Sequence, residues 1–217
     1  MATAAARAAA IQRGVRVEVV TIAWMVAEAA LAIGAGIAAR SVLLTAFGLD
    51  SVIELLSGIV LWRRLRFEAS GRSQDRIERM EQTTARISSV LLILLCAYVV
   101  VTSVGGLLVG LKPEGSRLGI AVAAAALVVM PLLALAKKRA NRDIGSASLR
   151  ADTAETITCA YMAAVTLAGI AVSSLFGVWW LQYVAAIALL IWLVPETREA
   201  LEAATGGRHE TDSRIED

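Results

Sequence analysis

Six apolar stretches, each about as long as a membrane-spanning helix must be, occupy most of this chain. A bilayer core requires roughly 20 consecutive apolar residues in a helix. The expected spans cover residues 17–39, 41–62, 84–111, 118–136, 149–175 and 178–195. The composition agrees, because 58% of the 217 residues are hydrophobic and the mean hydropathy is +0.68. The sequence therefore predicts an all-α membrane protein, a bundle of six transmembrane helices.

The distribution of basic residues predicts the orientation of the bundle. Basic residues gather before the first span, after the second, after the fourth and after the sixth; they are Arg7, Arg13, Arg16, Arg63, Arg64, Arg66, Arg72, Arg76, Arg79, Lys137, Lys138, Arg139, Arg142, Arg198, Arg208 and Arg214. The opposite connections hold fewer, namely Arg40, Lys112 and Arg117. Because cytoplasmic loops carry an excess of Lys and Arg, we expect both termini to be cytoplasmic.

The positions of the apolar spans divide the chain into one transmembrane domain and two tails. We expect residues 1–16 to form a cytoplasmic N-terminal tail, 17–196 a single transmembrane domain and 197–217 a short cytoplasmic C-terminal tail. The expected location is the inner (plasma) membrane of a bacterium, in contact with lipid. The sequence shows no phosphate-binding loop, nucleophile elbow or nucleic-acid module. We therefore expect neither an enzyme, nor an organic cofactor, nor a nucleic-acid partner.

Two pairs of ionisable side chains interrupt the apolar spans at a spacing of four residues. Asp50 and Glu54 lie in the second span, and Glu155 and Cys159 lie in the fifth. A charged side chain at the bilayer centre costs about 2.5–3.5 kcal/mol on insertion scales, so such residues indicate function. A spacing of four places both members of a pair on one helix face. No base is expected near the acids inside the membrane, which makes them poor structural links between helices.

The two pairs are predicted to lie at the same depth. Asp50 and Glu54 are about 18 and 12 Å from the cytoplasmic end of the second span, at about 1.5 Å per residue. Glu155 and Cys159 are about 13.5 and 19.5 Å from the cytoplasmic start of the fifth. If these helices are neighbours, Glu54 lies level with Glu155 and Asp50 with Cys159. The pairs then form one four-ligand site near mid-membrane.

Ligands of these types suit a divalent metal cation. Zinc takes four tetrahedral ligands, carboxylate and thiolate among them, and we favour it as the bound substrate. One sulfur among oxygens also accepts cadmium or cobalt, and iron or manganese stay open. The only histidine, His209, lies in the polar tail, so this is not a histidine-rich site. Because the ligands must lose protons to bind metal, binding offers a route to exchange of metal for protons.

Two further acids are candidates for an auxiliary role. Glu28 lies in the first span, where we expect a proton relay or an auxiliary ligand, with a hydrogen bond to a neighbouring helix as the alternative. Asp152 precedes Glu155 by three residues on the same side of the helix. Asp152 could pair with Arg150, cap the start of its helix, or pass ions onward.

The segments GLDSVIELLSGIVLWRRL and SLRADTAETITCAYMAAV resemble the membrane domain of cation diffusion facilitators. These are six-helix, usually dimeric metal transporters. Their second helix carries Asp-x-x-x-Asp or His-x-x-x-Asp, and their fifth carries Ala-Asp-x-x-His-x-x-x-Asp. The corresponding positions here are Asp50 and Glu54, then Ala151, Asp152, Glu155 and Cys159.

The resemblance implies proton-coupled efflux of a divalent metal from the cytoplasm by alternating access, in a homodimer. The chain looks like a short branch with the membrane domain only and no C-terminal cytoplasmic domain. It departs from the pattern because no histidine remains in the site, and because Gln182 and Tyr183 stand where an Asp-Pro is common. Gly106 and Gly110 form a small-residue face that could serve as a dimer seam or as close packing within one bundle.

Two other functions are compatible with the residues. A membrane metal-binding or sensing protein would bind the cation without moving it. A proton-coupled exporter of an organic cation would keep the acids but would need an aromatic-lined cavity, and only 5% of the residues are aromatic.

Overall fold

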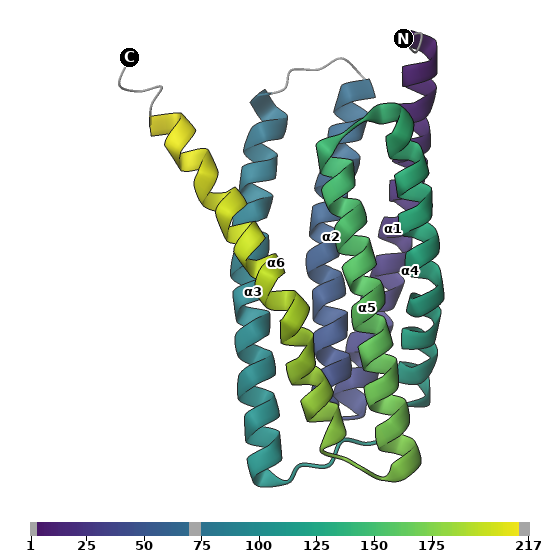
Figure 1. The fold of residues 1–217 in the computed structure, drawn as a ribbon, viewed down its shortest axis with the longest axis vertical. Coiled ribbons are helices and arrows are strands. Elements are labelled where there is room, and N and C mark those ends of the chain that lie inside the picture. Colours follow the sequence, from purple (N-terminus) through teal and green to yellow (C-terminus); the bar gives the residue numbers. More distant parts are fainter. Residues whose placement is uncertain (1–3, 70–74, 213–217) are drawn as a thin grey trace.

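The computed structural model describes residues 4–69 and 75–212, and this part of the chain forms an all-helical bundle without strands (Figure 1). The helices are α1 (Ala4–Ala38), α2 (Val42–Ala69), α3 (Asp75–Val109), α4 (Arg117–Ile144), α5 (Ala147–Phe176) and α6 (Leu181–Asp212). The predicted all-α membrane bundle is thereby confirmed. Arg72, Arg214 and the last residues of the predicted C-terminal tail lie outside the described residues.

The helices extend well beyond the expected spans at the end that holds both termini. Helix α3 begins at Asp75, and α6 continues through Pro195 to Asp212. These extensions are rich in Ala, Glu and Arg, which are strong helix formers, so the helix does not stop where the apolar run stops. Five helices, α1 to α5, are long and apolar enough to cross a membrane. The apolar part of α6, residues 181–194, is shorter.

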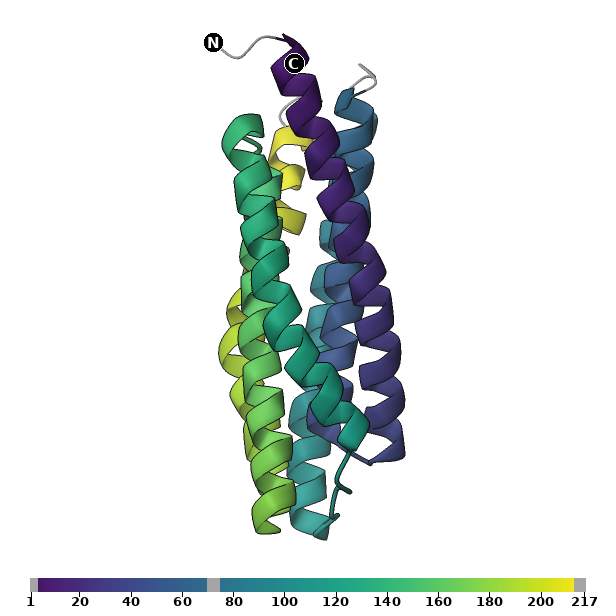
Figure 2. The ribbon, with the colours of Figure 1, turned by 90° about the vertical axis from the view of Figure 1, so that its right-hand side faces the viewer.

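The helices pack as a group of four and a pair. Helices α1, α2, α5 and α4 form a ring in which each contacts the next, while α3 packs chiefly along α6, which also contacts α5. Helix α2 touches both sets, because it contacts α1 and α5 as well as α3 and α6. Figure 1 shows α3 and α6 on one side of α2, and Figure 2 shows α1 and α4 on the opposite face. The start of α1 and the end of α6 lie at the same end of the bundle, as expected for an even number of crossings.

The bundle differs from a water-soluble protein in both its surface and its interior, because it exposes large apolar side chains and buries ionisable ones beside its apolar core. Large apolar side chains are exposed on its outside, including Val101, Leu108, Val128 and Leu175. Ionisable side chains are buried inside it; they are Glu18, Glu28, Asp50, Glu54, Lys137 and Asp152. Lipid accepts the apolar surface but does not solvate charge, so the charged groups must find partners within the bundle.

A tight connection fixes α4 antiparallel to α5. Gly145 ends α4 with φ 71°, a left-handed conformation that suits glycine, and its N–H donates to the Asn141 carbonyl at 2.8 Å. The Asn141 side chain accepts from the Ser146 N–H at 2.8 Å and donates to the Ser146 carbonyl at 3.0 Å. Ser146 in turn caps α5. Residues about two turns before and after this connection therefore face each other.

Close packing of α3 on α6 depends on one glycine. A Cβ added at Gly106 would lie 2.5 Å from the ring of Tyr183, and Tyr183 is fully buried. The Tyr183 hydroxyl donates to the Leu111 carbonyl at 2.8 Å, which holds the ring in place. Of the two interpretations of the small-residue face, Gly106 therefore serves packing within one bundle. Gly110 instead ends the α3 region with φ 70° and has open space around it.

We expect Gly106→Val to destabilise the protein by about 1–3 kcal/mol, because the held Tyr183 ring leaves no room for added methyl groups. Gly105→Val is the matched control, since a Cβ at Gly105 meets no atom within 4 Å. The measurement is thermal unfolding in detergent. Equal unfolding temperatures for the two variants would contradict this account of the α3–α6 contact.

Candidate metal centre

A cavity of about 590 Å³ lies between α2, α3, α5 and α6, in the half of the bundle nearer the termini. Glu54 of α2 and Glu155 of α5 line it, so the structure brings one member of each predicted pair to a shared space. Glu54 Oε1 and Glu155 Oε2 are buried and accept no hydrogen bond within the described part of the chain. Two carboxylate oxygens from facing helices are thus left open toward a ligand.

The other two predicted ligands do not line this cavity. Cys159 is 1% exposed, and its Sγ donates a long hydrogen bond of 3.7 Å to Glu28 Oε1. The thiol also lies close to Glu54 and Asp50, so the predicted alignment in depth of Cys159 with Asp50 stays a prediction. Asp50 has Glu196 of α6 and Glu54 among its charged neighbours.

The four predicted ligands are therefore neighbours but do not close around one point. Within residues 4–69 and 75–212, no three acidic, thiol or imidazole side chains are arranged so that they could hold a metal ion. The pairs lie on facing helices, because α2 contacts α5. The four-ligand site of Asp50, Glu54, Glu155 and Cys159 stays a prediction, and it requires a further approach of these side chains.

Glu28 joins three helices through hydrogen bonds. Its Oε1 accepts from Ser51 of α2 at 2.7 Å and from the Cys159 thiol of α5, and its Oε2 accepts from Trp24 of its own helix at 2.5 Å. The expected hydrogen bond to a neighbouring helix is present. A role for Glu28 as proton relay or auxiliary ligand is compatible with its contact to Cys159.

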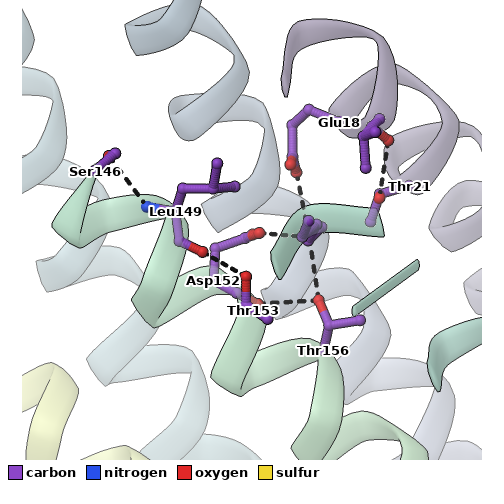
Figure 3. Close-up of polar contacts among 9 residues, drawn as sticks. Glu18, Thr21, Ser146, Leu149, Asp152, Thr153 and Thr156 are labelled. Atoms are coloured by element: carbon purple, nitrogen blue, oxygen red, sulfur yellow. Dashed lines mark hydrogen bonds and ion pairs between the residues drawn. The ribbon is translucent and has the colours of Figure 1, made fainter. Parts of the chain in front are cut away.

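A buried lysine, which the sequence analysis had placed in a cytoplasmic connection, pairs with Asp152. Lys137 lies on α4 and is 1% exposed. Figure 3 shows the side chains of its partners Glu18, Asp152 and Thr156. The Lys137 Nζ donates to Asp152 Oδ2 at 2.5 Å and to Thr156 Oγ1 at 3.1 Å, and it lies 3.5 Å from Glu18 Oε1 on α1. The expectation of no base near the acids was wrong, since Lys137 also acts on Glu54.

The contacts of Asp152 can be compared with its three possible roles. It pairs with Lys137 rather than with Arg150, which is exposed, and Ser146 rather than Asp152 caps α5. Asp152 lines the cavity, and its Oδ1 accepts no hydrogen bond among the described residues. The remaining role, passing ions onward, is compatible with this position.

Helical periodicity could have identified both Lys137 and Glu18. On α4 the buried residues include Met130, Leu133, Lys137, Asn141 and Ile144, which recur every three or four positions. The side chain of Lys137 therefore continues the buried face of its helix, although its neighbours Lys138 and Arg139 are exposed.

The same spacing on α1 joins Glu18 to three other buried positions, Thr21, Met25 and Glu28. The burial of Lys137 was missed because it lies in a cluster of basic residues. The burial of Glu18 was missed because it lies close to the end of the apolar run.

Helix α6 contributes acids that the motif analysis did not consider. Glu196 and Glu199, one turn apart, line the cavity opposite Glu54 and Glu155. Trp192, one turn before Glu196, lines it as well and stacks on Tyr161 of α5, with ring centroids 6.3 Å apart. Five acidic residues of the described part of the chain therefore line the cavity, Glu54, Asp152 and Glu155 from α2 and α5, and Glu196 and Glu199 from α6.

Comparison with known families identifies the chain. The cation efflux transmembrane domain matches residues 19–204, which include all six helical segments of the bundle. The chain belongs to the cation efflux family. Members of this family, the cation diffusion facilitators, are metal cation transporters rather than enzymes. No curated protein matches the chain.

Family membership confirms the resemblance drawn from the α2 and α5 motifs. It also confirms the coarse expectation of an integral membrane protein that handles a metal cation. The metal, the role of protons and the homodimer stay predictions.

The cavity predicts which positions a water-soluble thiol reagent reaches. In a Cys96→Ala, Cys159→Ala background, we expect Ser57→Cys to react, because Ser57 lines the cavity. The native Cys159, kept alone in a Cys96→Ala protein, should stay unmodified, because it is 1% exposed and outside the cavity. The measurement is maleimide labelling from the side that holds the termini. Fast modification of Cys159 together with protection of Ser57→Cys would contradict this geometry.

Proposed function

We propose that this member of the cation efflux family exports a divalent metal cation by exchange for protons, with alternating access to Asp50, Glu54, Glu155 and Cys159. Zinc is the favoured substrate, and cadmium, cobalt, iron and manganese are the other candidates. The protein then works as a homodimer in a bacterial plasma membrane.

The observation that carries this proposal is the meeting of Glu54 and Glu155 at one cavity. Each has a buried oxygen without a hydrogen-bond partner in the described structure. A buried carboxylate oxygen left without a partner is costly, so its retention on two facing helices favours a bound cation as the missing partner. If both termini are cytoplasmic, as the basic residues predict, the cavity lies on the side where the cargo of an exporter is collected.

The chemistry of the donors supports proton exchange. Carboxylates and a thiol must be deprotonated to coordinate a metal, so loading of the site releases protons. The reverse step, protonation from the opposite side, expels the metal. In the described conformation Cys159 contacts Glu28, and neither Cys159 nor Asp50 lines the cavity. We propose that closing of the cavity brings them to the cation.

Transport in inverted membrane vesicles tests the proposal. We expect uptake of Co²⁺ or Zn²⁺ together with proton counterflow, and a loss of about 10–100-fold or more in uptake rate for Glu54→Gln, because even indirect partners of a metal cost this much when removed. Glu114→Gln is the matched control, since Glu114 is exposed in the connection before α4. Wild-type rates in Glu54→Gln for zinc, cobalt and manganese would contradict the proposed site.

Binding without flux would instead support a metal-binding or sensing protein. A thermal-shift titration with Zn²⁺ beside a liposome flux assay separates the two, because a ligand that binds only the folded state raises its stability whether or not it is transported. The organic-cation exporter predicts full activity after Cys159→Ala.

A further inference from the structure

In the cluster around Lys137, one ammonium lies beside two buried carboxyl groups and does not use all of its hydrogen-bond donors within the described part of the chain. One ammonium faces two buried carboxylates, Asp152 at 2.5 Å and Glu18 at 3.5 Å. An ammonium has three donors, and two of them are used by Asp152 and Thr156. The contact with Glu18 is an ion pair without a hydrogen bond. The two acids come from α1 and α5, and Figure 3 shows Glu18 and Asp152 on these helices.

Glu18 offers the ammonium a second position. The residue is fully buried, and neither of its carboxylate oxygens accepts a hydrogen bond in the described structure. Its Oε1 lies against Gly58 of α2. A Cβ added at Gly58 would be only 3.1 Å from this oxygen, so the glycine leaves space for it. A lysine side chain is long and flexible, so its Nζ can cross from Asp152 to Glu18 by rotamer changes alone.

Asp152 is the member of the cluster that faces the cation cavity. It lines the cavity with Glu155, three residues later on the same helix face, and its Oδ1 is without a partner in the described residues. A divalent cation held near Glu155 would attract Asp152 and repel the Lys137 ammonium. The Lys137 ammonium and an incoming divalent cation would thus compete for the carboxylate of Asp152.

Building on the proposed transport of a divalent metal, we propose that Lys137 is a positioning and specificity-determining residue that controls Asp152. In the described state the Lys137 ammonium is paired with the Asp152 carboxylate. An arriving divalent cation takes Asp152 as its first ligand, and Lys137 moves to Glu18. A monovalent cation gains too little from Asp152 to displace the ammonium, so the lysine favours divalent over monovalent cations at the cavity.

Equilibrium binding of Co²⁺ to the purified full-length protein tests this inference through a double-mutant cycle. We expect Lys137→Met to tighten Co²⁺ binding about tenfold, the size typical of coupling between contacting charged groups. In an Asp152→Asn background the same change should have little effect, because Lys137 then has no ligand to withhold. Lys138→Met is the matched control, since Lys138 carries the same charge one residue away but is exposed.

A purely structural ion bridge and a general effect of charge give different results. If Lys137→Met weakens Co²⁺ binding, or if it tightens binding equally with and without Asp152→Asn, the inference is overturned. Should Lys137→Met not fold, Lys137→Gln in the same cycle replaces it, and Glu18→Gln is measured beside it. Glu18→Gln removes the second position of the ammonium, so Co²⁺ binding should weaken in the presence of Asp152 and not in its absence.

The test separates failure of this inference from failure of the proposed function. A wild-type protein that neither binds nor transports Co²⁺, Zn²⁺, Cd²⁺, Fe²⁺ or Mn²⁺ overturns both. A wild-type protein that transports Co²⁺, with a Lys137→Met effect that does not depend on Asp152, overturns only the role assigned to Lys137.

Discussion

A charge in the apolar interior of this bundle must be met by another group of the protein, because lipid does not solvate it. The arrangement of the four-helix group follows from this constraint. Lys137 of α4 links Glu18 of α1 to Asp152 of α5. Glu28 of α1, through its hydrogen bonds, reaches α2 at Ser51 and α5 at the Cys159 thiol. Polar groups that would be costly without partners in a membrane thus link α1, α2, α4 and α5 through their contacts.

The acids that remain incompletely paired point to the functional region. Glu54 and Glu155 face the cavity between the four-helix group and the α3–α6 pair, and each keeps a buried oxygen without a partner in the described structure. The buried bridges lie on the four-helix side of this cavity. In the transport cycle that we propose, the α3–α6 pair could therefore move relative to the group without breaking the ion pairs that hold the group together.

Much of the fold could be predicted from the sequence, because a bilayer imposes a length on each apolar run and a helix satisfies its own backbone. The six runs correspond to the six helices, and the short connections fall where they were expected. The helix ends could not be predicted, since the Ala-, Glu- and Arg-rich segments beyond the apolar runs favour helix regardless of the membrane. Helix α6 therefore continues past Pro195, and α3 begins before the apolar run.

The sequence by itself determined the spacing of Asp50 and Glu54, the matching pair on α5, and the family to which these motifs belong. Spacing is a property of one helix, so it can be read along the chain. Only the tertiary structure decided that Glu54 and Glu155 share a cavity, that Cys159 turns to Glu28, and that Lys137 is buried against Asp152. Each of these depends on how one helix is rotated against another, and that rotation is set by packing between distant segments.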